Sequence, residues 1–141
     1  MKSILVPVDG SEPSLNALKA AITMMREHGS DTLHVVNVQY PIVSGNVTRF
    51  ISSEAIHDYY HEEGEKMLAN ARALLAEAGI SAQIKTEVGP PAKTIAQYVK
   101  DHHCDLIIMG TRGLGGVSGL VLGSITTKVL HLVNVPVTLI K

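Results

Sequence analysis

The chain has 141 residues, which is enough for one domain with a substantial apolar core and too few for two ordinary domains. Hydrophobic residues make up 45% of it, with one Phe and no Trp, so we expect a compact interior of Val, Ile, Leu, Ala and Met. The 12 basic and 13 acidic residues leave a net charge of −1, which removes any general attraction to nucleic acid or to an anionic membrane. We therefore predict one domain over residues 1–141 with neither nucleic acid nor a membrane as partner.

Two features favour a cytoplasmic location. Cys104 is the only cysteine, so it cannot form a disulfide within the chain, and a reducing compartment fits it best. The apolar run near the N-terminus, residues 3–8, is too short for a signal peptide or a membrane span.

Short apolar runs alternate with longer segments of helical periodicity. Residues 3–8 end at Asp9-Gly10-Ser11, as expected of a strand buried on both faces, and Ser11 is a suitable N-cap for the next helix. The expected elements are, in order, a strand at 3–8, a helix at 11–28, a strand at 32–38, an irregular stretch at 40–53, a helix at 54–78, a strand at 80–88, a helix through 92–99, a strand at 105–108, a glycine-rich stretch at 109–124, a helix at 124–133 and a strand at 135–140.

Histidines in two of these elements have both a structural and a metal-binding interpretation. His34, in the second strand, is expected to be a hydrogen-bonded core or edge residue, because no partner at metal-binding spacing lies beside it. His57 and His61 are four residues apart on the long helix, but a zincin motif would need Glu after the first, so a solvated face is favoured. The apolar residues of this helix are expected to lie on one side of it, namely Ile56, Tyr60, Met67, Ala71, Leu74 and Ala78.

The alternating order predicts an α/β fold, a doubly wound, five-stranded parallel sheet with helices on both faces. The simplest strand order is 3-2-1-4-5, which makes the first and fourth strands neighbours. The last strand carries Pro136, best tolerated at a sheet edge, yet both its faces are apolar. An exposed edge of this kind favours pairing with a second copy, so we expect a homodimer through residues 135–141.

The stretch from Met109 to Ser124 is the strongest functional signal. It follows an apolar strand and precedes a helix, and its glycines allow positive φ angles and a close approach of backbone amides to a ligand. Ser124 is expected to be the N-cap of that helix, whose free amides and dipole favour a phosphate. The stretch therefore predicts a nucleotide phosphate site, with a flexible surface connection as the alternative.

Two common nucleotide motifs are excluded. A Walker loop needs Lys after its last glycine, whereas this chain has Gly123-Ser124-Ile125. A dinucleotide fingerprint opens the first βα unit and is followed by an acidic residue about 20 positions later, and neither condition is met.

The end of the first strand should lie beside the glycine-rich stretch. Ligands of open α/β sheets bind at the C-terminal ends of the strands where the strand order reverses. This places residues 7–11 next to residues 110–113. There Asp9 has two roles that the sequence leaves open, a hydrogen bond to a base or ribose and the fixing of its own turn.

The spacing Gly110-x-x-Gly113, nine residues, Gly123-Ser124 is similar to the ATP-binding signature of the universal stress protein family. The opening residues 4–12, the run 33–36, the turn 89–91 and the closing residues 136–140 also resemble single-domain members. The resemblance implies a Rossmann-like fold, dimerisation through the last strand, and ATP as ligand, with AMP or cyclic AMP as alternatives. It places Pro7, Val8, Asp9, Val35 and Met109 at the adenine and ribose end, and Gly110, Gly113, Gly123, Ser124 and Ile125 at the ribose and phosphate end.

Binding is better supported by the sequence than catalysis. The stretch itself offers one cation, Arg112, so the remaining triphosphate charge would need Mg²⁺. It contains no evident general base or paired nucleophile, which predicts slow hydrolysis at most. We expect a nucleotide-binding regulatory protein of the stress response. A slow ATPase is the first alternative, and an interaction module with a vestigial site is the second.

Overall fold

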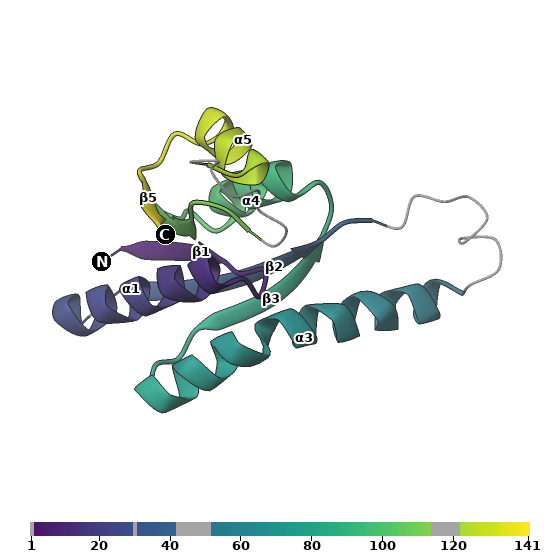
Figure 1. Ribbon diagram of the computed structural model, residues 1–141, viewed down its shortest axis with the longest axis horizontal. Helices are drawn as coiled ribbons and strands as arrows, with labels where there is room; N and C mark the ends of the chain where they lie inside the picture. The colour runs from purple at the N-terminus through teal and green to yellow at the C-terminus, as the bar shows by residue number, and fades with distance from the viewer. Residues whose placement is uncertain (1, 30, 42–51, 114–121) are drawn as a thin grey trace.

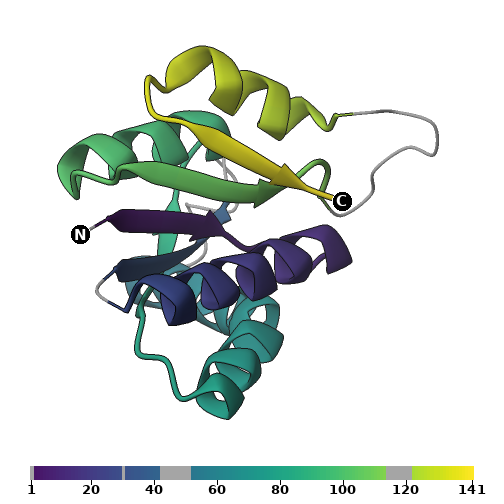
Figure 2. The same cartoon turned by 90° about the vertical axis from the view of Figure 1, so that its left-hand side faces the viewer.

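The computed structural model describes residues 2–29, 31–41, 52–113 and 122–141 of the chain. Five parallel strands form one sheet in the order β3-β2-β1-β4-β5, which confirms the predicted fold class and strand order. Helices α1 and α3 lie on one side of the sheet and α4 and α5 on the other (Figures 1 and 2). The elements are β1 (Ser3–Pro7), α1 (Glu12–His28), β2 (Thr32–Gln39), α3 (Ser53–Ala78), β3 (Gln83–Val88), α4 (Pro91–Asp101), β4 (Leu106–Gly110), α5 (Ser124–Leu132) and β5 (Val137–Ile140).

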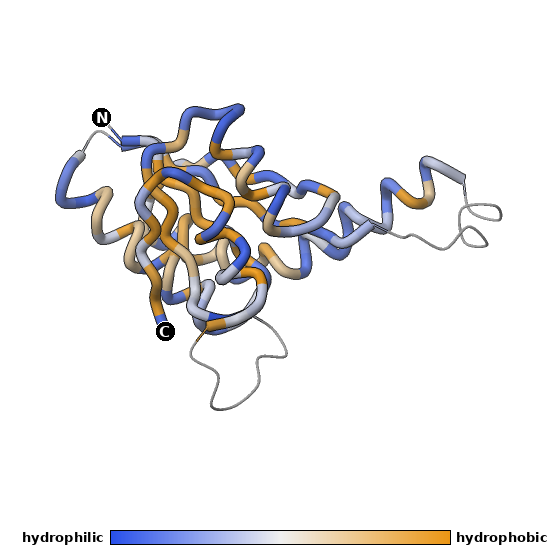
Figure 3. Tube along the Cα trace, turned by 90° about the horizontal axis from the view of Figure 1, so that it is seen from above, coloured by the Kyte–Doolittle hydropathy of each residue, from blue (hydrophilic) through white to orange (hydrophobic). Residues whose placement is uncertain are grey.

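The central strands are apolar on both faces because helices cover both faces. In β1, Ile4 and Val6 pack into the core under α1 and α3, while Leu5 packs into the core under α4 and α5. All three side chains are fully buried. Figure 3 shows the same arrangement, with apolar residues gathered in the interior of the molecule and hydrophilic residues on the outer helices. No helix in the described part of the chain combines the length and apolar character that a membrane crossing requires.

Helix α1 ends where the sequence predicts. Its N-cap is Ser11, whose hydroxyl accepts a hydrogen bond from the Ser14 amide. Gly29 takes the left-handed conformation at the C-cap, with φ of 73°, and donates its N–H to the Met25 carbonyl.

The buried face of α3 differs from the expected one. Its buried residues are Gly64, Leu68, Ala71 and Leu75. Of the predicted residues, Ala71 is buried and Leu74 and Ala78 pack against the core, whereas Tyr60 and Ile56 are partly buried and are not part of that core. The N-terminal end of α3 extends past the sheet (Figure 1), and apolar periodicity there does not correspond to core packing. The close approach occurs at Gly64, where an added Cβ would overlap the side chain of Thr86 on β3.

Two strands begin later than the sequence predicts. Residue 80 belongs to the end of α3, because the N–H of Ile80 binds the Leu75 carbonyl while the N–H of Gly79 binds Ala76. Strand β3 therefore starts at Gln83, opposite His34. Likewise β5 starts at Val137, and Pro136 contributes only its carbonyl, which accepts the Ile107 N–H at 3.0 Å.

Candidate functional site

The C-terminal ends of β1 and β4 lie side by side in the middle of the sheet (Figure 2). Pro7 is the last residue of β1 and is followed by Val8 and Asp9, and Gly110 is the last residue of β4. The two segments after these strands then touch, because a Cβ added to Gly113 would overlap Oδ2 of Asp9. The fold thus brings the two predicted parts of the site together.

Asp9 fixes the turn between β1 and α1. Its Oδ1 accepts hydrogen bonds from both the amide and the hydroxyl of Ser11, and the amide bond is 2.9 Å long. Ser11 is in turn the N-cap of α1. One of the two roles left open for Asp9 is therefore seen directly, and contact with a base or ribose stays a prediction.

The glycines at the ends of the stretch are sites of close backbone packing. A Cβ at Gly110 would lie 2.8 Å from Cβ of Pro13, and one at Gly123 would lie 3.1 Å from Cα of Arg112. The Gly123 amide also donates to the Thr111 carbonyl at 2.7 Å, which joins the two ends of the stretch. Residues 114–121, with the glycines at 115, 116 and 119, lie outside the described part of the chain.

The prediction that Ser124 caps α5 is wrong by one position. Gly123 is the N-cap, with an extended backbone at φ −73° and ψ 162°, and no side-chain hydrogen bond from a described residue caps this helix. The Gly123 carbonyl accepts both the amide and the hydroxyl of Thr127 at 3.0 Å each. Ser124 is therefore the first residue of the helix. The amides of Ser124 and Ile125 belong to the first turn of α5, whose N–H groups have no carbonyl partner within the helix.

The remaining predicted residues are held by the sheet. Val8, Val35 and Met109 are buried, with exposed fractions of 2%, 0% and 5%, while Pro7 at the end of β1 is partly buried. Val8 and Val35 belong to the core under α1 and α3, and Met109 to the opposite core. Their side chains already pack against other described residues of the two cores, so a role at the adenine end of the site stays a prediction.

A cavity of about 300 Å³ lies next to the glycine-rich stretch. Two of the predicted residues, Arg112 and Gly113, line this cavity. Asn16 of α1 and Lys141, which the sequence analysis did not single out, line it as well. The side-chain amide of Asn16 donates to the Lys141 carbonyl at 3.1 Å. No motif links two residues so far apart in sequence, so only the fold could identify them. The other lining residues are Glu12 and Pro13.

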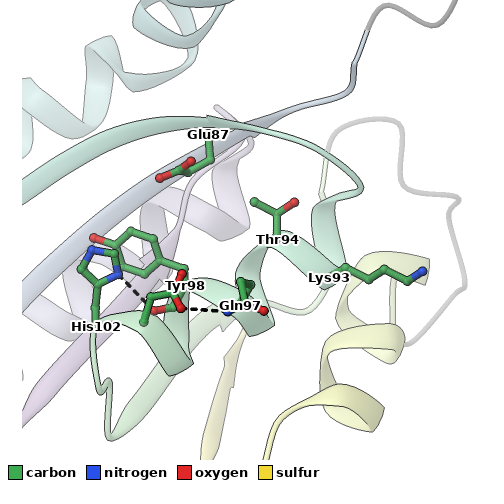
Figure 4. Close-up of a pocket in the computed structure, with 7 residues that line it drawn as sticks. Glu87, Lys93, Thr94, Gln97, Tyr98 and His102 are labelled. Carbon is green, nitrogen blue, oxygen red and sulfur yellow. Dashed lines mark hydrogen bonds between the residues drawn. The ribbon is translucent and has the colours of Figure 1, made fainter.

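A second cavity, also of about 300 Å³, lies between β3 and α4 and contains none of the predicted site residues (Figure 4). Behind it, Nδ1 of His34 makes a 2.7 Å hydrogen bond with the Tyr98 hydroxyl, and the Tyr98 and His102 rings stack at 3.8 Å. The prediction that His34 is a hydrogen-bonded core residue is confirmed. The residues that line this second cavity are Glu87, Lys93, Thr94, Gln97, Tyr98, Asp101 and His102.

Burial determines the protonation of this cluster. Burial, and after it the nearby His102, lowers the pKa of His34 below its ordinary value of 6.5. Burial likewise raises the pKa of Tyr98 to about 12. Both rings are therefore neutral near pH 7, as a hydrogen-bonded core pair requires. His57 and His61 on α3 are exposed to solvent, and within the described ranges no three His, Cys, Asp or Glu side chains are grouped to hold a metal.

The model of the universal stress protein family matches residues 1–141. The universal stress protein MJ0531 of Methanocaldococcus jannaschii is 31% identical over 146 residues, covering 99% of this chain and 82% of that protein. YxiE, a universal stress protein of Bacillus subtilis, is 31% identical over 145 residues, and the alignment covers 98% of this chain and 97% of YxiE.

Solved structures show the same fold. MJ0577, also from Methanocaldococcus jannaschii, superposes with a TM-score of 0.84 at 27% identity, over 99% of this chain and 95% of that one. A universal stress protein solved in complex with cAMP has a TM-score of 0.73 at 21% identity, over 99% and 97% of the two chains. A family protein of Arabidopsis thaliana solved with AMP bound has a TM-score of 0.69 at 21% identity, over 100% and 92%.

Proposed function

The chain belongs to the universal stress protein family, and from this premise we propose that it is a regulatory protein that binds an adenine nucleotide at the C-terminal ends of β1 and β4. ATP is the first candidate, with AMP or cyclic AMP as the alternatives. Two proteins of the same fold were solved with cAMP and with AMP, which supports an adenine nucleotide as the ligand class.

One observation carries the proposal. The first amides of α5 lack a side-chain cap among the described residues, and they follow directly on Gly123, where an added Cβ would lie 3.1 Å from Cα of Arg112. Unpaired helix amides and the positive end of the helix dipole favour a phosphate. Each hydrogen bond from an amide to a charged phosphate contributes about 1.5–3 kcal/mol, so several can hold a nucleotide without a Walker lysine.

Each predicted residue then has a role in the proposed site. Arg112 supplies a positive charge to the phosphates, and Mg²⁺ bound to those phosphates balances the rest. Ser124 and Ile125 offer their amides at the start of α5. At the other end, Pro7, Val8 and Asp9 with Val35 and Met109 form the surroundings of the adenine and ribose.

We also propose that the protein is a homodimer paired through residues 135–141. The strand order places β5 at the edge of the sheet, where it has β4 as its one hydrogen-bonded neighbour among the described strands. An apolar edge strand left open favours pairing with another chain. An isologous interface is the commonest way for identical chains to satisfy such an edge.

The first test is mass spectrometry of small molecules released when the purified protein is denatured, followed by calorimetry with ATP. We expect adenine nucleotide from the wild type, and at least tenfold weaker ATP binding by Gly113→Ala, because the new Cβ overlaps the Asp9 carboxylate. Gly29→Ala is the matched control, since it strains a left-handed C-cap of α1 away from the site.

Two results would contradict the proposal. One is a wild-type protein that releases no nucleotide and binds neither ATP, AMP nor cyclic AMP. The other is a Gly113→Ala variant that binds ATP as well as the Gly29→Ala control does.

A further inference from the structure

The turn that follows β1 would form the base end of the proposed nucleotide site. The backbone pairing of β1 with β2 ends at Pro7, opposite Val36. One residue later, the Val8 amide still donates to the Val36 carbonyl at 2.8 Å. Beyond this point the backbone turns away through Asp9 and Gly10 toward α1. Besides the hydrogen bonds of Asp9 with Ser11, the contact that holds the Val8 carbonyl therefore bears on the position of this turn.

The side chain of Asn37 holds that carbonyl. Asn37 lies on β2 with an exposed fraction of 1%, and its Nδ2 donates to the Val8 carbonyl at 2.8 Å. A carbonyl can only accept, so the atom that faces it must be the amide nitrogen. The oxygen end of the same amide is consistent with this orientation, because Oδ1 of Asn37 accepts a 2.6 Å hydrogen bond from Nε2 of Gln39. Both ends of Asn37 are thus fixed.

Met67 of helix α3 lies next to the same turn. The sulfur of Met67 lies 3.3 Å from Nδ2 of Asn37 and 3.4 Å from Nε2 of Gln39. Gly10 has φ of 85°, and a Cβ built on it would be 3.7 Å from the Met67 backbone. The turn therefore lies between a side chain of β2 and the backbone of α3.

We infer that Asn37 is a positioning residue for the base end of the nucleotide site: it acts through the Val8 carbonyl to set where Val8, Asp9 and Gly10 meet an adenine. This inference rests on the proposed function. Asn37 itself does not touch the ligand. A buried amide whose partners are all protein atoms fixes geometry, and loss of its donor leaves a buried carbonyl unpaired.

The deciding variant is Asn37→Asp, which keeps the shape of the side chain and replaces the donor with an acceptor facing the Val8 carbonyl. We expect ATP binding, measured by calorimetry, to weaken at least tenfold. Gln39→Leu, which frees Oδ1 of Asn37 and leaves its contact with Val8, should weaken binding about threefold, and it keeps the inference testable if Asn37→Asp folds poorly.

Two controls separate positioning from loss of stability and from added charge. The first is Ile95→Val or Ile95→Ala in the core under α4, whichever matches the thermal destabilisation of Asn37→Asp. The second is Asn70→Asp, the same chemical change at an exposed position of α3. Both should bind ATP within twofold of the wild type.

A further readout follows the turn without ligand. In ¹H–¹⁵N spectra of nucleotide-free protein, the amides of Asp9 and Gly10 should shift in Asn37→Asp and stay in place in the Ile95 control. The inference is overturned if Asn37→Asp and Gln39→Leu bind ATP within twofold of the wild type, or if the Ile95 variant loses as much affinity as Asn37→Asp. A wild-type protein that binds no adenine nucleotide refutes the proposed function itself, before any variant is compared.

Discussion

At the scale of single residues, two serines in similar sequence settings have different structural roles. Ser11 caps α1 with its hydroxyl and also donates to Asp9, whereas Ser124 stands one position inside α5, after the Gly123 cap. Replacing a capping serine with alanine costs about 0.5–2 kcal/mol of stability. A serine at the first helical position has no such hydrogen bond to lose, because its hydroxyl does not reach back to a helix amide.

We therefore expect Ser11→Ala to lower the free energy of unfolding by about 1 kcal/mol or more and Ser124→Ala by less than about 0.5 kcal/mol. Urea unfolding of the nucleotide-free proteins measures both values. If the two variants lose equal stability, Ser124 is a cap after all. If Ser124→Ala keeps its stability and yet binds ATP more weakly, its hydroxyl acts on the phosphates alone.

At the scale of elements, the cluster that joins β2 to α4 predicts a pH dependence. His34 is buried and its pKa is lowered below 6.5, so between the lowered value and 6.5 the unfolded chain binds more protons than the folded protein. Stability therefore falls as the pH drops below about 6.5 and continues to fall until the pH passes the lowered pKa. Protonation would also place a positive charge beside the His102 ring, which lies 5.5 Å from the His34 ring between centroids.

The expected result is a lower free energy of unfolding at pH 5.5 than at pH 7.5, measured with urea. His34→Gln, which can still reach the Tyr98 hydroxyl, should lose this part of the dependence. The charged residues that line the adjacent cavity, Glu87 on β3 and Lys93 and Asp101 on α4, are kept in both proteins. An unchanged pH slope in His34→Gln would show that His34 does not titrate with folding.

How far the sequence predicts an element depends on whether local chemistry or tertiary contact decides it. The caps of α1 follow from Ser11 and Gly29 alone, and the N-cap Ser11 and the end of the helix at residue 28 were both predicted. Ile80 was assigned to a strand because residues 80–88 alternate loosely, but the chain reversal after Gly79 uses its N–H to end α3. The buried face of α3 depends on the point where Gly64 meets Thr86, and nothing local to α3 indicates that contact.

The candidate site divides in the same way. The glycine spacing and the switch-point rule bring Asp9 to Gly113, and the fold confirms that they meet. The sequence could not reveal that Asn16 lies beside Lys141, or that Asn37 holds Val8, because these pairs are 125 and 29 residues apart and carry no motif. Long-range side-chain contacts of this kind become visible only in the assembled sheet.

At the scale of the whole molecule, the two edges of the sheet differ in chemistry. Strand β3 carries Lys85 and Glu87 at one edge, and charged side chains of this kind discourage pairing with another chain. Strand β5, at the opposite edge, has three apolar residues and Thr138, whose side chain is exposed. Pairing of copies is thus favoured at β5 alone of the two edges.

The outward groups of β5 follow from its pairing with β4. The Pro136 carbonyl accepts from Ile107 of β4, and the Ile140 carbonyl accepts from Thr111, directly after β4. The backbone groups of the alternate residues, Val137 and Leu139, therefore point away from β4. A second copy related by a two-fold axis would pair with them antiparallel. Thr138 is the midpoint of residues 135–141, so its two copies face each other if the axis passes through the middle of this segment.

This geometry makes a charge-reversal test possible. Wild-type protein should sediment as a dimer, whereas Thr138→Lys and Thr138→Glu should each sediment as monomers, because like charges oppose each other across the axis. An equimolar mixture of the two variants should recover the dimer, since opposite charges then meet. A Thr138→Lys variant that remains fully dimeric would place the interface elsewhere. A monomeric wild-type protein would contradict the proposed dimer, because β5 would then have no partner strand in a second copy.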